Sequence, residues 1–425
     1  TREQTEEQER TSQGTIKTDE TPWGWPMPPT HPLVPMLPGM MGLAPQVEKL
    51  SSAALTDKQL DNLPEAQPSQ VVRLPDGGTL DLEASLVRRS LVDGFETLMM
   101  AFNGQLPGPM IRVDEKSTVF INFTNKTLIP TAVHWHGVRL DNRFDGVPGL
   151  TQDPVEQNGT FRYQIYFPDA GIYWYHPHHR EDIMQELGLY GNLLVDPRPA
   201  GYYSPVNKEE VLILDDFLIN SRGENVWFGQ ESANYMLMGR FGNVPLVYGE
   251  PRYTLVVKDG EVVRFHLTNA SNTRTFNISF IANEWYESHV RGVAEPLKEA
   301  ANGRLPIKVV ATDVSKFERE DWAESVVIAP AERYVVEVHF PGKSAGELLS
   351  GQESYLLVNQ VQGINHRQGV FRPEISVLGE IDVRETEPSR TRSVEFEKLR
   401  QNADVIADID QYRPLFDKTV DHELL

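Results

Sequence analysis

Short segments with alternating apolar and polar residues dominate the chain after residue 80. Turn-forming Gly, Pro, Asn and Asp residues separate these segments about every ten residues. Successive side chains of a strand point to opposite faces, so each segment can bury one face and expose the other. The pattern predicts an all-β chain folded as antiparallel sandwiches.

An internal repeat divides this pattern into two similar halves. Residues 114–125 (DEKSTVFINFTN) recur as residues 259–269 (DGEVVRFHLTN), about 145 residues later, which is the size of one sandwich domain. Each copy has an acidic turn, a strand of period two and a Thr-Asn pair. Residues 134–136 (HWH) follow the first copy, whereas residues 277–279 (NIS) follow the second. We predict two copies of one sandwich, with a histidine face in the first copy alone.

The pattern predicts four regions. Residues 1–80 form a partly disordered arm rich in Pro and Met, 81–199 the first sandwich, 200–385 the second, and 386–425 a linker that ends in the start of a further strand. A helical piece is expected from Ser393 to Asn402. The arm contains a Met-rich stretch, with Met27, Met36, Met40 and Met41. Thioethers bind Cu(I), but an apolar, extended segment packed on the body is the preferred interpretation of the stretch.

The histidines of the first copy fall into two His-X-His clusters, at residues 134–136 and 176–178. Residues i and i+2 of a strand share a face, so two such strands side by side give a patch of four imidazoles. Imidazole suits copper, zinc, iron and nickel. A single histidine on a strand is more often a hydrogen-bonded core or rim residue. The isolated histidines are interpreted in that way: His266, His289, His339 and His366.

The amino-acid composition excludes several kinds of metal site and several kinds of partner. The 425 residues include no Cys, which excludes disulfides, thiolate zinc sites, iron–sulfur clusters and a blue copper centre within this sequence. The net charge of −21 argues against nucleic acid or an anionic membrane as a partner. No run of eighteen apolar residues is present, so no membrane span is expected. A zinc hydrolase would need a carboxylate beside the histidines, and Asp145 and Asp153 leave that alternative open.

These motifs resemble the multicopper oxidases, the laccase and copper-resistance oxidase group built from cupredoxin domains. The resemblance covers residues 100 to 425. It includes FNGQLPGP at 102–109, HWHG at 134–137, DGVPG at 145–149 and WYHPH at 174–178, supported by GNVPLVYG at 242–249 and APAERY at 329–334. It implies tandem cupredoxin-like Greek-key sandwiches, and it implies copper.

Roles follow from the resemblance residue by residue. His134 would bind the type 2 copper, His136 and His176 one type 3 copper, and His178 the other. Asp145 matches an acidic position that helps to deliver protons to O2, although a turn aspartate in a Gly/Pro loop is the simpler interpretation. His179 has no counterpart, and Trp135 and Trp174 are expected to pack around the site.

The resemblance implies an oxidase in which a phenolic, aromatic or Cu(I) donor gives single electrons and O2 becomes water. Only half of the eight cluster histidines are present, and the blue site is missing. We expect the first two cupredoxin domains of a secreted or periplasmic enzyme, completed by a third domain from the same precursor or a partner chain. The alternatives are a copper-binding or copper-sequestering module without turnover and a copper-free structural relative.

Overall fold

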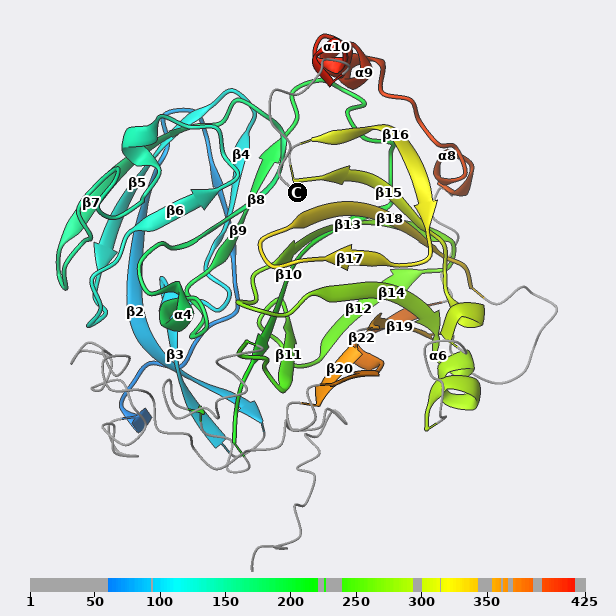
Figure 1. The fold of residues 1–425 in the computed structure, drawn as a ribbon, viewed down its shortest axis with the longest axis horizontal. Helices are drawn as coiled ribbons and strands as arrows, with labels where there is room; N and C mark the ends of the chain where they lie inside the picture. Colours follow the sequence, from blue (N-terminus) through cyan, green and yellow to red (C-terminus); the bar gives the residue numbers. More distant parts are fainter. Residues whose placement is uncertain are drawn as a thin grey trace, which may run out of the picture.

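The computed structural model describes residues 60–92, 95–220, 225–226, 239–292, 300–313, 315–342, 354–360, 362–365, 370–384 and 392–416. In this part of the chain two β-sandwiches lie side by side, the first on the left of Figure 1 and the second on the right. The Met-rich stretch and the expected start of a further strand after residue 420 lie outside the described residues.

The first sandwich pairs a sheet of order β1-β4-β9-β8-β6 with a sheet of order β3-β2-β5-β7. Its strands are β1 (Val71–Leu74), β2 (Thr79–Val92), β3 (Phe95–Phe102), β4 (Met110–Asp114), β5 (Thr118–Asn125), β6 (Val133–His136), β7 (Thr160–Tyr166), β8 (Gly171–Pro177) and β9 (Gly191–Asp196). Two short helical turns accompany them, η1 (Asn142–Phe144) and α4 (Glu181–Met184).

The second sandwich pairs a sheet of order β11-β10-β13-β18-β15-β16 with a sheet of order β12-β22-β19-β14-β17. Its strands are β10 (Lys208–Phe217), β11 (Val244–Val247), β12 (Tyr253–Lys258), β13 (Glu261–Asn269), β14 (Phe276–Ala282), β15 (Ile307–Thr312), β16 (Lys316–Ala323), β17 (Val326–Ile328), β18 (Arg333–Phe340), β19 (Ser354–Asn359) and β22 (Ser376–Arg384). A separate hairpin joins β20 (Gln362–Asn365) and β21 (Val370–Pro373). The helical turns are α6 (Asn283–Trp285), η2 (Tyr286–Val290) and η3 (Ala301–Gly303).

The alternation seen in the sequence builds the cores. Along β5, Val119, Ile121 and Phe123 are fully buried and belong to the apolar core of the first sandwich. Along β13, Val263, Phe265 and Leu267 do the same in the second. The expectation of purely antiparallel sheets is wrong, because β2 runs parallel to β5, β10 to β13 and β12 to β22. Each sandwich is therefore a mixed structure with crossover connections.

The two sandwiches are joined by apolar and polar contacts. Ile172 and Leu194 of the first pack in one cluster with Val335 of the second. The Gln185 side-chain amide donates a 2.8 Å hydrogen bond to the carbonyl of Ala270. Apolar contact combined with a buried hydrogen bond fixes the relative placement of the two sheets that meet there.

Two expectations at the chain ends need correction. Strand β1 lies within residues 1–80 but pairs in parallel with β4, so residues from Val71 onward belong to the first sandwich and not to the arm. The helix expected from Ser393 to Asn402 ends early, as α8 (Ser393–Phe396). The backbone of residues 400–402 instead pairs with β16, where the Glu320 N–H donates to the carbonyl of Arg400. Backbone hydrogen bonds to a sheet edge have replaced those of the helix.

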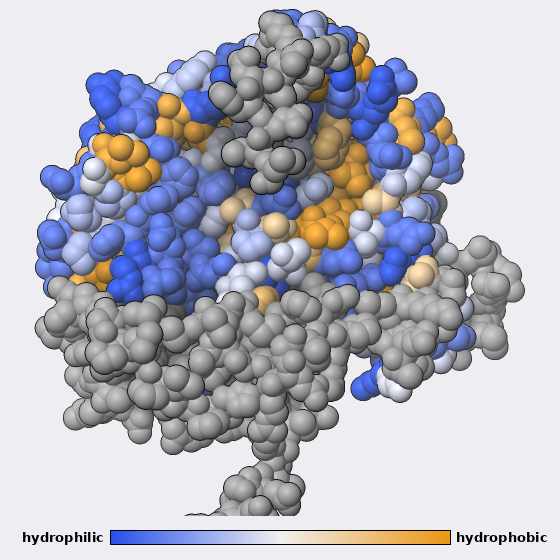
Figure 2. Space-filling view, in the orientation of Figure 1, coloured by the Kyte–Doolittle hydropathy of each residue, from blue (hydrophilic) through white to orange (hydrophobic). Residues whose placement is uncertain are grey.

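The rest of this segment forms α9 (Ala403–Asp410) and α10 (Arg413–Phe416). Phe396 is buried against Trp322 of β16 and His339 of β18, so the segment packs on the second sandwich. Near β17, Figure 2 shows hydrophobic side chains gathered on the surface, where Val327 is 55% exposed. Among the helices that the structure describes, none is long and apolar enough to cross a membrane.

Candidate metal centre

Strands β6 and β8 place the predicted histidines on one face. They pair antiparallel, with His134 directly opposite His176 and His136 opposite Trp174. The alternating residues Trp135 and Tyr175 point the other way, into the core of the first sandwich. The apolar residues of the two strands therefore fix the direction of the imidazoles, as period-two alternation requires.

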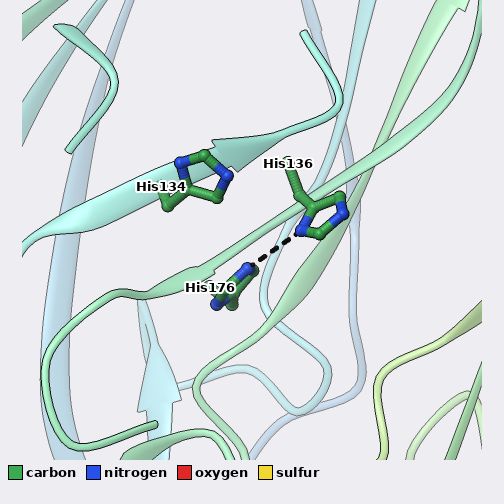
Figure 3. A group of neighbouring side chains, drawn as sticks. All are labelled: His134, His136 and His176. Carbon is green, nitrogen blue, oxygen red and sulfur yellow. Dashed lines mark hydrogen bonds between the residues drawn. The ribbon is translucent and has the colours of Figure 1, made fainter. Parts of the chain in front are cut away.

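Three of the four predicted histidines converge. Their ring nitrogens, one from each of His134, His136 and His176, all lie within 4.8 Å of one another. Figure 3 shows the three rings facing a common space, with Nδ1 of His136 3.3 Å from Nε2 of His176. Two imidazole nitrogens at this separation can share a proton in a hydrogen bond, or both can bind a metal ion.

The second nitrogen of two of these rings is held by a backbone carbonyl. Nδ1 of His134 donates to the carbonyl of Asp145 over 2.7 Å, and Nδ1 of His176 donates to the carbonyl of Pro177 over 2.8 Å. Such bonds fix the tautomer, because the nitrogen that donates must carry the hydrogen. Nε2 of each ring is then left with its lone pair available for a ligand bond.

His178 follows β8 and lies beside His134, but it is not among the three residues whose ring nitrogens converge. Its ring centroid is 5.1 Å from that of His134 and 6.1 Å from that of His176. Nδ1 of His178 lies 3.3 Å from a carboxylate oxygen of Glu181, the first residue of α4. This contact orients the ring and leaves Nε2 free. His179 turns away, with Nδ1 against the carbonyl of Pro130.

Burial keeps the converging imidazoles neutral. It lowers the pKa of His134, and it lowers the pKa of His176 well below its usual range. Burial, together with the positive charge of Arg333, lowers the pKa of His136 to about 3. Neutral imidazole is the form that binds metal ions, so the site carries its ligands already deprotonated at neutral pH.

Trp174 lies flat against two of the rings. Its ring centroid is 4.2 Å from that of His176 and 5.0 Å from that of His136, at interplanar angles of 23° and 29°. The expectation that Trp174 packs around the site is met. Trp135, by contrast, is buried among core residues and reaches the site only through the backbone of β6.

Asp145 contacts the site through two different groups. Its carbonyl accepts the hydrogen bond from His134, and its carboxylate oxygen lies 3.4 Å from the same Nδ1. The loop can approach this closely because Gly146 follows, with φ of 73°; a Cβ there would overlap the carbonyl of Val133. Asp145 is thus a turn residue in a Gly/Pro loop, as the simpler interpretation held, and it also lies beside the histidine cluster.

Sequence reasoning did not single out Arg333 and Glu181. Arg333 comes from β18 of the second sandwich, reaches the backbone carbonyl of Ile172 over 3.2 Å, and pairs with Asp313. Its only signal was its place in the APAERY segment, which gave no reason to put it beside His136. Glu181 could have been found from its position three residues after His178, at the start of a polar turn.

The donor set suits a borderline transition metal. Uncharged imidazoles with free lone pairs, held by hydrogen bonds to backbone carbonyls and backed by an aromatic ring, are ligands for copper or zinc and not for magnesium or calcium. The histidines of two adjacent strands of the first sandwich thus form a candidate metal centre on a β scaffold. The residues present therefore fit copper.

Comparison with known proteins identifies the family. A family model described as "Multicopper oxidase" matches residues 85–200. The chain is 44% identical over 108 residues to the multicopper oxidase MCE of Talaromyces pinophilus, a match over 25% of this chain and 18% of that protein. It is 37% identical over 129 residues to copper resistance protein A of Pseudomonas syringae pv. tomato, over 30% of this chain and 20% of that protein. These matches cover about a fifth of each relative.

Solved structures extend the likeness to most of the described chain. Lac15 from a marine microbial metagenome is 30% identical, with a TM-score of 0.53 over 73% of this chain and 68% of that one. The multi-copper oxidase of Pseudomonas thermotolerans shares the fold at 24% identity, with a TM-score of 0.57 over 75% of this chain and 65% of that one. The chain belongs to the multicopper oxidase family, and the predicted all-β fold of tandem cupredoxin-like sandwiches is confirmed.

Proposed function

We propose that this chain supplies the amino-terminal half of the trinuclear copper site of a laccase-like multicopper oxidase. In this assignment His134 binds the type 2 copper, His136 and His176 one type 3 copper, and His178 the other. The supporting observation is the convergence of three imidazole nitrogens within 4.8 Å on β6 and β8. Copper held there would supply one-electron chemistry, passing four electrons from single-electron donors to O2.

The residues of the chain prepare the site for that reaction. The carbonyls of Asp145 and Pro177 hold Nδ1–H of their histidines, so that each Nε2 faces the ligand space. Trp174 covers the back of the rings and excludes water from that side. Reduction of O2 to two waters needs four protons, and the Asp145 carboxyl, 3.4 Å from His134 and 30% exposed, would pass them inward.

The remaining partners belong to the same proposal. A third cupredoxin domain, from the same precursor or a partner chain, would contribute the other four histidines and the blue copper with its Cys. That domain would receive electrons from a phenolic, aromatic or Cu(I) donor. The proposal also includes two sandwich domains, at residues 71–199 and 200–385. It places the protein outside the cytoplasm, as a secreted or periplasmic enzyme.

Oxygen uptake tests the proposal. The chain alone, loaded with Cu(II) and given a phenolic donor, is expected to bind copper but not to consume O2. Addition of a separately produced third cupredoxin domain of the family should restore uptake at four electrons per O2, with water as the product. Turnover by the chain alone, or failure to bind copper at all, would contradict it.

A non-catalytic copper-sequestering module is the second candidate. The absence of Cys from the sequence favours it, since no blue copper can form within these 425 residues. Here the chain would hold copper tightly by itself, and no third domain would elicit oxygen uptake. The same experiment therefore separates the two functions.

A further inference from the structure

A cavity of about 260 Å³ lies where the two sandwiches and their connecting segment meet. The first sandwich contributes Leu194 and Val195 of β9, and the connection contributes Tyr202, Tyr203 and nearby prolines. The second contributes Glu209 of β10 and two residues of β13, Arg264 and His266. None of the four cluster histidines lines it, so this cavity is separate from the metal centre (Figure 1 places β9, β10 and β13 at the junction).

His266 lines the cavity with unused hydrogen-bonding capacity. Its side chain is 3% exposed, and neither ring nitrogen has a hydrogen-bond partner among the described residues. The nearest carboxylate oxygen, on Glu209, is 3.9 Å from Nε2, which is beyond hydrogen-bond range. A buried polar group without a partner costs stability, and native proteins keep such groups rarely. Burial lowers the pKa of His266, so the neutral ring offers one donor and one acceptor.

The charged neighbours decide what the cavity can accept. Arg264 does not offer a site for an anion, because its guanidinium already donates to Glu209 over 2.7 Å, to Glu337 and to the carbonyl of Ser204. The Glu209 carboxylate, paired with Arg264, would repel a second carboxylate. The adjacent Arg264 disfavours a metal cation. With anions and metal cations both disfavoured, the cavity suits an uncharged ligand.

The polarity and shape of the cavity walls indicate what the main part of the ligand should be. The walls are mainly apolar and flat, formed by Tyr202, Tyr203, Pro197 and Pro199 beside Leu194. The volume of about 260 Å³ lies just below the usual range of small-molecule sites, roughly 300 to 1,000 Å³, and suits a single ring. Hydroxyl hydrogens on the ligand would be accepted by Glu209 or by the bare nitrogen of His266.

We propose that this cavity binds a small, uncharged, single-ring compound that carries a hydroxyl group, with His266 and Glu209 as its polar contacts. The inference does not depend on copper binding by the histidine cluster. It gives the junction of the sandwiches a second ligand, held by residues from both sandwiches and from their connection.

Fluorine NMR titration of the full chain with 4-fluorobenzyl alcohol tests this proposal. Saturable binding is expected, at least tenfold tighter than for 4-fluorotoluene, which lacks the hydroxyl, and for 4-fluorobenzoate, which adds a negative charge. His266→Phe should weaken binding at least tenfold while leaving folding intact, since an aromatic ring replaces an unpaired polar one. Glu209→Gln should weaken it severalfold. His339→Phe on β18, away from the cavity, is the matched control and should bind as the original chain does.

The proposal would be overturned by an absence of saturable binding, by equal binding of the His266→Phe chain, or by tighter binding of 4-fluorobenzoate than of the alcohol. A zinc or copper ion lost on His266→Phe but retained when His134 and His176 are replaced would show a metal site instead. A second variant guards against misfolding: should His266→Phe fail to fold, unchanged affinity in Glu209→Gln would equally refute the proposal.

Discussion

The two sandwiches share one scaffold and differ at one face. In the first, β5 pairs in parallel with β2 and antiparallel with β7; in the second, β13 pairs in the same way with β10 and β18. At the end of each strand stands an asparagine with the same four hydrogen bonds. Asn125 donates to the carbonyls of Ile129 and Val155 and accepts from the backbone and hydroxyl of Thr127. Asn269 donates to the carbonyls of Arg274 and Ile328 and accepts from the backbone and hydroxyl of Ser271.

Beyond these asparagines the two copies diverge. β14 of the second sandwich takes the place of β6, and its outward residues, Asn277 and Ser279, stand where the first has His134 and His136. Opposite them, the Gln360 side-chain amide donates to the Ser279 hydroxyl, and the Gln360 backbone carbonyl accepts from the Asn277 side-chain amide. The second face links its polar groups to one another, with the side-chain oxygen of Asn277 left without a partner, whereas the first face brings three imidazole nitrogens together. The scaffold therefore accommodates either set of side chains, and under the proposed function those of one strand pair decide whether copper is bound.

The largest effect is expected on copper affinity. His176→Gln removes a central ring nitrogen and should weaken copper binding at least about 100-fold, roughly 3 kcal/mol. Gln360→Ala, at the corresponding face of the second sandwich, should leave copper affinity unchanged and lower only the melting temperature. Equilibrium competition with a copper chelator measures both. Equal loss of copper in the two variants would contradict the distinction between the faces.

A smaller effect is expected from Asp145→Asn. The variant keeps the backbone carbonyl that orients His134 but loses the carboxyl that would carry protons. Copper content should stay the same, and oxygen uptake in the completed enzyme should fall about 100-fold, within the usual range for a lost acid or base. Asp153→Asn, an exposed residue of the same loop, is the control. If Asp145→Asn loses copper instead, the carboxylate holds the ligand and does not move protons.

The shared asparagines should have equal importance for stability. Asn125→Ala and Asn269→Ala each remove the side-chain amide bonds to two buried carbonyls and leave a backbone N–H without its side-chain acceptor, at an expected cost of about 2 kcal/mol. Chemical unfolding of each variant measures the free energy. Asn269→Ala should keep copper affinity, since its sandwich has no histidine face. A cost confined to one of the two variants would show that the repeat is a likeness of sequence and not of structure.

The smallest effect concerns pH in the second sandwich. Burial raises the pKa of Asp215 well above its usual range, with the neighbouring Asp216 adding to the effect. The folded chain keeps this proton above the unfolded pKa of about 3.9, so this group lowers stability as pH rises from there toward its folded pKa. Asp215→Asn should remove that trend and stabilise the fold by about 1 kcal/mol at pH 7. Melting temperatures from pH 4 to 8 measure it.

Asp216 supplies the contrast. Its carboxylate pairs with Arg274 over 2.6 Å, deep in the second sandwich. Asp216→Asn should therefore destabilise the fold at pH 7, opposite in sign to Asp215→Asn, because it breaks a buried ion pair with the Arg274 guanidinium. The same sign for both variants would mean that Asp215 is ionised and has an ionic partner of its own.

Local patterns predicted much of this molecule. The alternation of β5 and β13, the repeat that contains them, and the shared face of His134 and His136 all follow from the two-residue period of a strand. What the sequence did not predict arises from contacts distant along the chain. Arg333 reaches the candidate metal centre from the second sandwich. The chain after Phe396 leaves the helical conformation and forms backbone hydrogen bonds with the edge of β16. Such outcomes depend on which surfaces meet, and local propensity carries no information about that.

X-ray absorption of copper bound to the full chain tests the central claim most directly. The account predicts nitrogen ligands with the outer-shell pattern of imidazole, and loss of that signal when His134 and His176 are both changed to Gln. Sulfur neighbours from the Met-rich stretch, or imidazole-bound copper that survives the double change, would contradict it.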